Sequence, residues 1–106
     1  MRVIERQMNK AIANRQDWKS ANTSVHYEQE NEISRVFLHG NLIAEIGEGF
    51  LKLYDGGWQS NTTKSRLNAI LSENGFGDEK VYQKDFQWFI QHDGITEPFA
   101  SGMILR

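Results

Sequence analysis

Apolar residues near the amino terminus recur with the period of a helix. Four of them stand at positions i, i+4, i+7 and i+8 and form one stripe (Ile4, Met8, Ala11 and Ile12). The polar residues between them fall on the other side (Arg2, Glu5, Arg6, Asn9 and Lys10). Basic residues at the start of a helix oppose its dipole, so we expect this helix to depend on packing its stripe against the core.

Between residues 22 and 54 the pattern changes to alternation, which is typical of strands with one buried face. Val25 and Tyr27 belong to the first strand, and Val36 and Leu38 belong to the second. Three turn signals divide the segment (residues 29–32, 40–41 and 47–49). The pair at 40–41 predicts a type I′ or II′ hairpin turn. The segment is therefore predicted to be a four-stranded antiparallel meander.

A second helix is predicted after the glycines at positions 56 and 57. Four consecutive residues can cap its amino terminus (Ser60, Asn61, Thr62 and Thr63). Its apolar stripe again has helical spacing (Thr63, Leu67, Ile70 and Leu71). Asn74 and Gly75 are expected to end it, with Gly75 in the left-handed conformation.

Beyond Gly77 the pattern returns to strand. Residues 81–91 are rich in aromatic side chains, Asp93 and Gly94 predict a turn, and residues 99–105 predict a returning strand. Pro98 is expected at a sheet edge or at the start of a strand.

These elements predict one α+β domain over residues 1–106. Its predicted order is an N-terminal helix, a four-stranded antiparallel meander, a second helix, and a C-terminal two-strand hairpin on the same sheet. No linker, repeat or low-complexity segment interrupts it.

Composition excludes several classes of protein. The chain has no Cys, which rules out a disulfide framework and Cys-based zinc sites. No apolar run is long enough for a membrane span, and the amino terminus does not resemble a signal peptide, so we expect a soluble cytoplasmic protein without membrane contact. The three His residues are not spaced as metal ligands, and no catalytic constellation is recognisable. We expect no cofactor, no metal and no catalytic residues.

The net charge of −2 conceals an uneven distribution. Residues 1–20 carry five basic and two acidic side chains, whereas residues 21–57 carry two basic and six acidic ones. This asymmetry suits either a bipolar binding surface or a basic helix that neutralises an acidic sheet, and we favour the second interpretation.

Aromatic residues in the segment 82–88 have two interpretations. Phe86, Trp88 and Ile90 would share one face of a strand, and packing into the core is the favoured role of such a ladder. Interleaved with Lys84, the aromatic rings would alternatively stack single-stranded bases. The net negative charge argues against nucleic acid.

The turn into the second helix has the composition of a ligand site. Glycines, hydroxyls, a helix amino terminus and two cations together suit a phosphate or carboxylate. The tentative ligand-binding residues are Trp58, Ser60, Thr62, Thr63, Lys64 and Arg66. The spacing is not that of a P-loop. The alternative, which we favour, is an ordinary turn and helix cap with Lys64 and Arg66 in solvent.

The whole chain also resembles a family of small uncharacterised proteins of tailed bacteriophages, the podophages and cyanophages. The residues that carry the resemblance lie at positions 4–8, 11–12, 22–23, 25, 36–44, 57–69 and 82–88. The resemblance implies a phage accessory protein that acts in the cytoplasm of the host cell. It brings no catalytic residues with it.

We therefore expect a non-enzymatic binding module whose partner is a host or phage protein, with homo-oligomerisation through a strand edge or aromatic patch as one form of this. The alternative is a protein that binds nucleic acid or a phosphate ligand through the turn at residues 58–66 and the basic first helix. A structural role in the virion is a third hypothesis, and an enzyme without a recognisable motif is a fourth.

Overall fold

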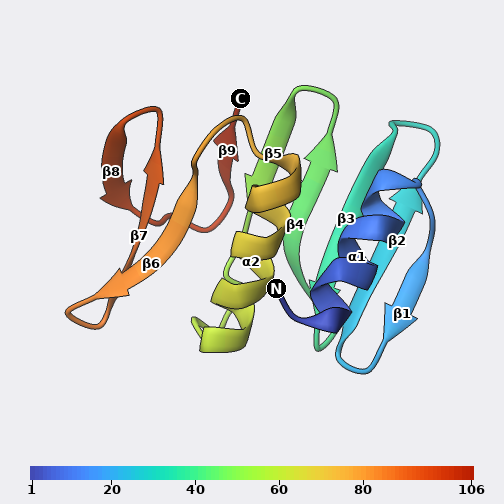
Figure 1. The fold of residues 1–106 in the computed structure, drawn as a ribbon, viewed down its shortest axis with the longest axis horizontal. Coiled ribbons are helices and arrows are strands. Elements are labelled where there is room, and N and C mark those ends of the chain that lie inside the picture. The colour runs from blue at the N-terminus through green and yellow to red at the C-terminus, as the bar shows by residue number, and fades with distance from the viewer.

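The computed structural model describes residues 1–106 as an α+β fold with two helices and nine strands. The elements are α1 (Val3–Ala13), β1 (Trp18–Ser20), β2 (Thr23–Glu28), β3 (Ile33–Leu38), β4 (Asn41–Gly47), β5 (Phe50–Leu53), α2 (Asn61–Asn74), β6 (Lys80–Lys84), β7 (Gln87–His92), β8 (Ile95–Pro98) and β9 (Met103–Leu105). One antiparallel sheet has the order β1-β2-β3-β4-β5-β9, and a second has the order β6-β7-β8. Both helices lie on the same face of the six-stranded sheet (Figure 1).

Helix α1 buries the predicted stripe and also part of its predicted polar side. Met8, Ala11 and Ile12 are buried in the core, as expected. Glu5 and Asn9 are buried as well, and the Asn9 side-chain amide donates to the carbonyl oxygen of Ala69 in α2 at 3.0 Å. The prediction that both residues face solvent is wrong, because α1 packs against α2 as well as against the sheet.

The predicted meander is confirmed as β2 to β5, and one further strand lies at each edge of it. Strand β1 pairs with β2 at one edge, and β9 pairs with β5 at the other. Strand β1 was not predicted, because its three residues are too few for alternation to show, whereas β9 lies within the returning strand predicted over residues 99–105 and joins this sheet as predicted. The hairpin between β3 and β4 turns at His39 and Gly40, whose φ angles are 52° and 78°, and not at the predicted pair 40–41.

A β-bulge sets which residues of β4 reach the core. Val36 pairs with Ala44, whereas its neighbour Phe37 pairs with Leu42, so Ile43 is the extra residue. Ile43 and Ala44 are consecutive in the sequence and both are buried. The bulge thus fills the core beneath α2 and leaves Phe37 and Leu42 on the other side of the sheet.

Helix α2 follows the prediction at its start and along its buried stripe. Ser60 is the cap residue, and its hydroxyl accepts a hydrogen bond from the Thr63 amide at 3.1 Å. The four residues of the predicted stripe are all buried. Gly75 ends the helix with a φ of −73°, so the expected left-handed conformation is wrong.

The structure differs most from the prediction in the carboxyl-terminal segment, after Gly77. The strand expected over residues 81–91 is broken by a turn at Asp85 and Phe86, whose φ angles are 52° and 64°. Strands β6, β7 and β8 form a separate sheet, and only β9 joins the main one. Trp88 and Ile90 are buried as predicted, whereas the Phe86 side chain lies at the hairpin tip and is 96% exposed. Pro98 ends the edge strand β8, which confirms its expected place at an edge.

The buried hydrophobic residues of both helices and both sheets form one cluster. Trp88 on β7 meets Phe99 edge to face, with ring centroids 5.4 Å apart, and the Phe99 amide donates to the Trp88 carbonyl at 3.0 Å. These contacts fix the segment that leads from the small sheet to β9.

Candidate functional site

The turn at residues 58–66 uses two of its six candidate residues to cap α2. The Ser60 and Thr63 hydroxyls lie 2.9 Å apart, and Thr63 is buried. Their hydrogen-bonding groups are thus engaged with each other and with the helix terminus. This is the helix cap that the favoured interpretation of the sequence described.

Arg66 lies inside the protein. Its NH1 group is 2.8 Å from the Glu5 carboxylate, and its Nε donates to the Thr23 hydroxyl at 3.0 Å. Ser65 donates a further hydrogen bond to Glu5 at 2.6 Å. Burial alone would raise the pKa of Glu5, but the hydrogen bonds from Ser65 and Arg66 outweigh it and hold that pKa below its ordinary value. The expectation of a solvated Arg66 is therefore wrong, because its charge joins α1 to α2 and β2.

The other three candidate residues of this turn, Trp58, Thr62 and Lys64, remain at least partly accessible. The Trp58 side chain is 75% exposed and borders a hollow of about 80 Å³ that neither Lys64 nor Arg66 lines. Asp55 also lines this hollow, and its carboxylate accepts a hydrogen bond from the Gly57 amide at 2.8 Å. An anion there would meet this carboxylate. The structure does not gather the six candidate residues around one cavity.

The face of the six-stranded sheet opposite the helices carries no covering element (Figure 1). We call it the open face, and its side chains follow from strand register (Lys19, Ser24, His26, Glu28, Ile33, Arg35, Phe37, Leu42, Glu45, Phe50, Lys52, Tyr54 and Ile104). Antiparallel sheets with one solvated face usually place polar residues on it. Five of these thirteen residues are Ile, Leu or Phe, so the open face combines polar and apolar side chains.

A row of alternating charge crosses the middle of the open face. Arg35 pairs with Glu45 on the next strand, and Glu45 pairs with Lys52 on the strand beyond. The Arg35 guanidinium bonds Glu45 at 2.9 Å and Glu28 at 3.1 Å. These hydrogen bonds outweigh desolvation and raise the pKa of Arg35. The Tyr54 hydroxyl donates to Glu45 at 2.6 Å, so the row is held by direct bonds.

Apolar side chains flank the charged row on both sides. Phe37 and Leu42 form a cross-strand pair on one side, with Ile33 and Phe50 on the other. The Phe50 ring lies over Gly47, where any Cβ would collide with it. Ile104 extends the face at its β9 edge with 46% of its side chain exposed. The open face thus combines aromatic and aliphatic contacts with fixed charges.

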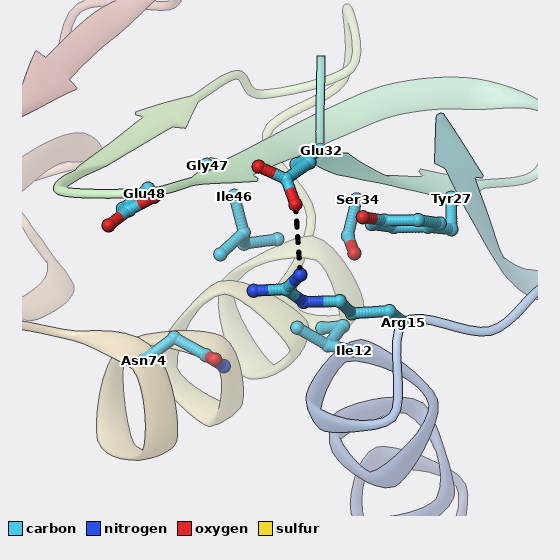
Figure 2. Close-up of a pocket in the computed structure, with 9 residues that line it drawn as sticks. All are labelled: Ile12, Arg15, Tyr27, Glu32, Ser34, Ile46, Gly47, Glu48 and Asn74. Atoms are coloured by element: carbon cyan, nitrogen blue, oxygen red, sulfur yellow. Dashed lines mark hydrogen bonds and ion pairs between the residues drawn. The ribbon is translucent and has the colours of Figure 1, made fainter. Parts of the chain in front are cut away.

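A separate pocket lies on the helix-covered side of the sheet, at the carboxyl-terminal ends of α1 and α2 (Figure 2). It has a volume of about 290 Å³ and is lined by Ile12, Arg15, Tyr27, Glu32, Ser34, Ile46, Gly47, Glu48 and Asn74. Arg15 and Glu32 form an ion pair of 3.1 Å across it. Neither this pocket nor any other part of the chain has a group of three or more carboxylates or imidazoles arranged to hold a metal ion.

Comparison with known protein families gives a match along residues 1–106, to the family described as Kyanoviridae Gp96 protein. The chain belongs to this cyanophage family. The resemblance to cyanophage proteins seen in the sequence is confirmed. No curated protein and no solved structure matches the chain. Neither helix is both long and apolar enough to cross a membrane.

Sequence reasoning did not single out the open face or the pocket. The open face had a signal, because Phe37 and Arg35 alternate with buried residues of a predicted strand and so had to share its outer side. The pocket had none. Its lining comes from both helix ends, strands β2 to β4 and two turns, and only tertiary structure brings these segments together.

Proposed function

We propose that this cyanophage protein is a non-enzymatic protein-binding module and that the open face receives its partner. The observation that carries the proposal is the uncovered charged row between two apolar rows. Interfaces between proteins are enriched in aromatic residues and Arg, and their cores bury apolar side chains around a few fixed polar groups. The open face offers Phe37 and Phe50 beside Arg35 in this arrangement.

The hydrogen bonds within the charged row favour binding. Arg35, Glu45 and Tyr54 already hold one another in place, so a partner orders few further side chains when it docks. The alternating charges also select for a partner with complementary groups, because misplaced like charges would be costly. We expect the partner to be a host or phage protein met in the host cytoplasm, or a second copy of the chain.

The test is quantitative capture from cyanobacterial cells that express a tagged copy. The double variant Phe37→Thr with Leu42→Thr places β-branched Thr, which suits strands, at both positions and removes apolar area from the open face. The matched control, Tyr82→Thr with Phe89→Thr, makes the same kind of change to the stacked pair on the outside of the small sheet, where the ring centroids are 5.8 Å apart. Circular dichroism and thermal unfolding establish that both variants fold.

We expect the wild type and the control to enrich the same partner. The open-face variant should enrich that partner at least about tenfold less, because a central apolar pair contributes more than about 1.4 kcal/mol to the free energy of binding. Equal enrichment by all three proteins would contradict the proposal. Light scattering on the purified chain then separates a second copy from a different protein as the occupant.

Nucleic-acid or phosphate binding is the second candidate function, and the exposed side of α1 favours it. Arg2, Arg6 and Lys10 are exposed, follow one another at four-residue intervals, and form no ion pair. Four residues of helix rise about 6 Å, so the three cations form one row. Such a row suits a phosphate backbone.

Fluorescence anisotropy with a labelled single-stranded oligonucleotide tests this second function. Binding should weaken steeply with salt and be lost in the triple variant Arg2→Gln, Arg6→Gln and Lys10→Gln, while Lys64→Ala reports on the turn at residues 58–66. Arg66 is unsuitable for this test, because its replacement breaks the internal ion pair. Absence of oligonucleotide binding at low salt would contradict this second function.

A further inference from the structure

The small sheet of β6, β7 and β8 has one face in the core and one face in solvent. Val81, Trp88 and Ile90 are buried in the core. Side chains alternate along a strand, so the residues between these lie on the opposite face. We call this the small-sheet face, and strand register places eight residues on it (Lys80, Tyr82, Lys84, Gln87, Phe89, Gln91, Thr96 and Pro98). Figure 1 shows the small sheet at the end of the molecule away from α1.

Two aromatic side chains form the middle row of the small-sheet face. Tyr82 on β6 lies directly opposite Phe89 on β7, and their rings stack with centroids 5.8 Å apart and an angle of 24° between the ring planes. Both residues are partly exposed. Exposed rings held on a sheet are a platform on which the bases of a single strand stack.

The charges on the small-sheet face are all positive. Lys80 and Lys84 are exposed and form no ion pair, and none of the eight residues is acidic. The two cations flank Tyr82 on the same strand, and four residues of strand span about 13 Å. The small-sheet face therefore carries a charge opposite to the net charge of −2 of the whole chain. This local charge is complementary to a phosphate backbone.

Phe86 adds a third ring at the tip of the same hairpin. Its side chain is 96% exposed, and its φ of 64° is costly for a residue with a Cβ. Strained residues of this kind cluster at functional sites. The ring lies two residues beyond Lys84, so it extends the aromatic surface past the end of β6.

We infer that the small-sheet face binds single-stranded nucleic acid. Bases stack on Tyr82, Phe89 and Phe86, while Lys80 and Lys84 contact the phosphates. Stacking and phosphate contacts do not discriminate between base sequences, so the strands bound in a cell are of mixed length and sequence. The small-sheet face belongs to a different sheet from the open face and a different element from the cations of α1, so this inference does not rest on the proposed function.

Fluorescence anisotropy at low salt tests the inference with labelled strands of about twelve nucleotides, a length within the range that single-strand sites cover. The probes are a DNA strand of thymidines, an RNA strand of uridines, and a DNA strand of the same length without bases. The strand without bases keeps the phosphate charge and removes all stacking. Tighter binding of the DNA or of the RNA strand identifies which nucleic acid the face prefers.

The variants separate stacking from charge. Phe86→Ala removes the exposed ring, and Phe86→Trp restores a ring at the same position. Lys80→Gln with Lys84→Gln removes both cations of the small-sheet face. Its matched control is Lys19→Gln with Lys52→Gln, which removes two lysines from the open face. Circular dichroism and thermal unfolding establish that each variant folds.

We expect the strands with bases to bind at least about tenfold more tightly than the strand without bases, and Phe86→Ala to weaken their binding about tenfold while Phe86→Trp does not. The variant of Lys80 and Lys84 should reduce the slope of log affinity against log salt concentration by about 1.4, or about 0.7 for each phosphate contact, and its control should not.

Three results would overturn the inference. The first is no binding of either strand at low salt, and the second is equal binding of the strand without bases. The third is unchanged binding in Phe86→Ala together with loss of binding in the triple variant of α1, which would assign the nucleic acid to the cations of that helix.

Discussion

Glu5 of α1 and Arg66 of α2 form a buried ion pair, with 2.8 Å between the carboxylate and the guanidinium and 3% and 4% of their side chains exposed. Ser65 and Thr23 complete the hydrogen bonding of the two groups. The pair joins both helices to β2. Buried charges are tolerated only when paired and hydrogen-bonded, and this network meets that condition.

Replacing Arg66 by Ala should destabilise the protein by about 3–5 kcal/mol, because it leaves the Glu5 carboxylate buried without its partner. Urea unfolding followed by circular dichroism measures this loss. Lys64→Ala is the matched control, since Lys64 bonds only Gln83 at the surface. A loss for Arg66→Ala below about 1 kcal/mol would show that the pair contributes no more than a surface salt bridge.

The same carboxylate should make stability depend on pH. The pKa of Glu5 in the folded protein is held below its ordinary value of 4.5 by the hydrogen bonds that outweigh burial. The unfolded chain therefore binds a proton first as pH falls. The contribution of Glu5 is complete above pH 4.5 and is lost as pH falls through its lower folded pKa.

Unfolding free energies measured in steps between about pH 6 and about pH 3 test this dependence. Glu5→Gln removes the titrating group and should give a shallower decline than the wild type, whatever its stability at neutral pH. Glu30→Gln, at an exposed turn, should keep the wild-type slope. Identical slopes for the wild type and Glu5→Gln would show that other carboxylates cause the acid sensitivity.

The hairpin tip between β6 and β7 holds Phe86 at a φ of 64° with its side chain in solvent. A left-handed conformation is costly for a residue with a Cβ and cheap for Gly. Phe86→Gly should therefore stabilise the protein by about 0.5–1 kcal/mol, after the entropy of the added Gly is counted. Thermal unfolding measures the gain.

Phe86→Ala is the matched control for the tip, because it removes the exposed ring but keeps the Cβ. We expect no gain from this variant. Equal stabilisation by Ala and Gly would show that the exposed ring, and not the backbone conformation, is the unfavourable feature.

The main elements were predictable because their hydrophobic period is clear. The stripe of α2 and the alternation of β2 and β3 each have one buried side, which periodicity reports directly. The helical pattern placed Glu5 on the polar side of α1, whereas the structure buries it. The reason is that α1 contacts both the sheet and α2, and the contact with α2 buries residues outside the apolar stripe. Periodicity gives no information about such polar contacts between helices.

The division into two sheets was not predictable from local pattern. The turn at Asp85 and Phe86 lacks the Gly that usually marks a type I′ turn, so residues 81–91 resembled one strand. The tentative site at residues 58–66 rested on composition, which predicted a helix cap among residues 60–63 but gave no sign that Glu5 would bond Arg66 from 61 positions away.

The central claim is that the open face is the protein-binding surface, and site-specific photo-crosslinking tests it most directly. A photoreactive benzoylphenylalanine replaces Phe37 on the open face in one variant and Phe89 on the outside of the small sheet in the other. Both are expressed in cyanobacterial cells and irradiated. The account predicts one adduct of defined mass from position 37 and none from position 89; no adduct from position 37, or the same adducts from both, would contradict it.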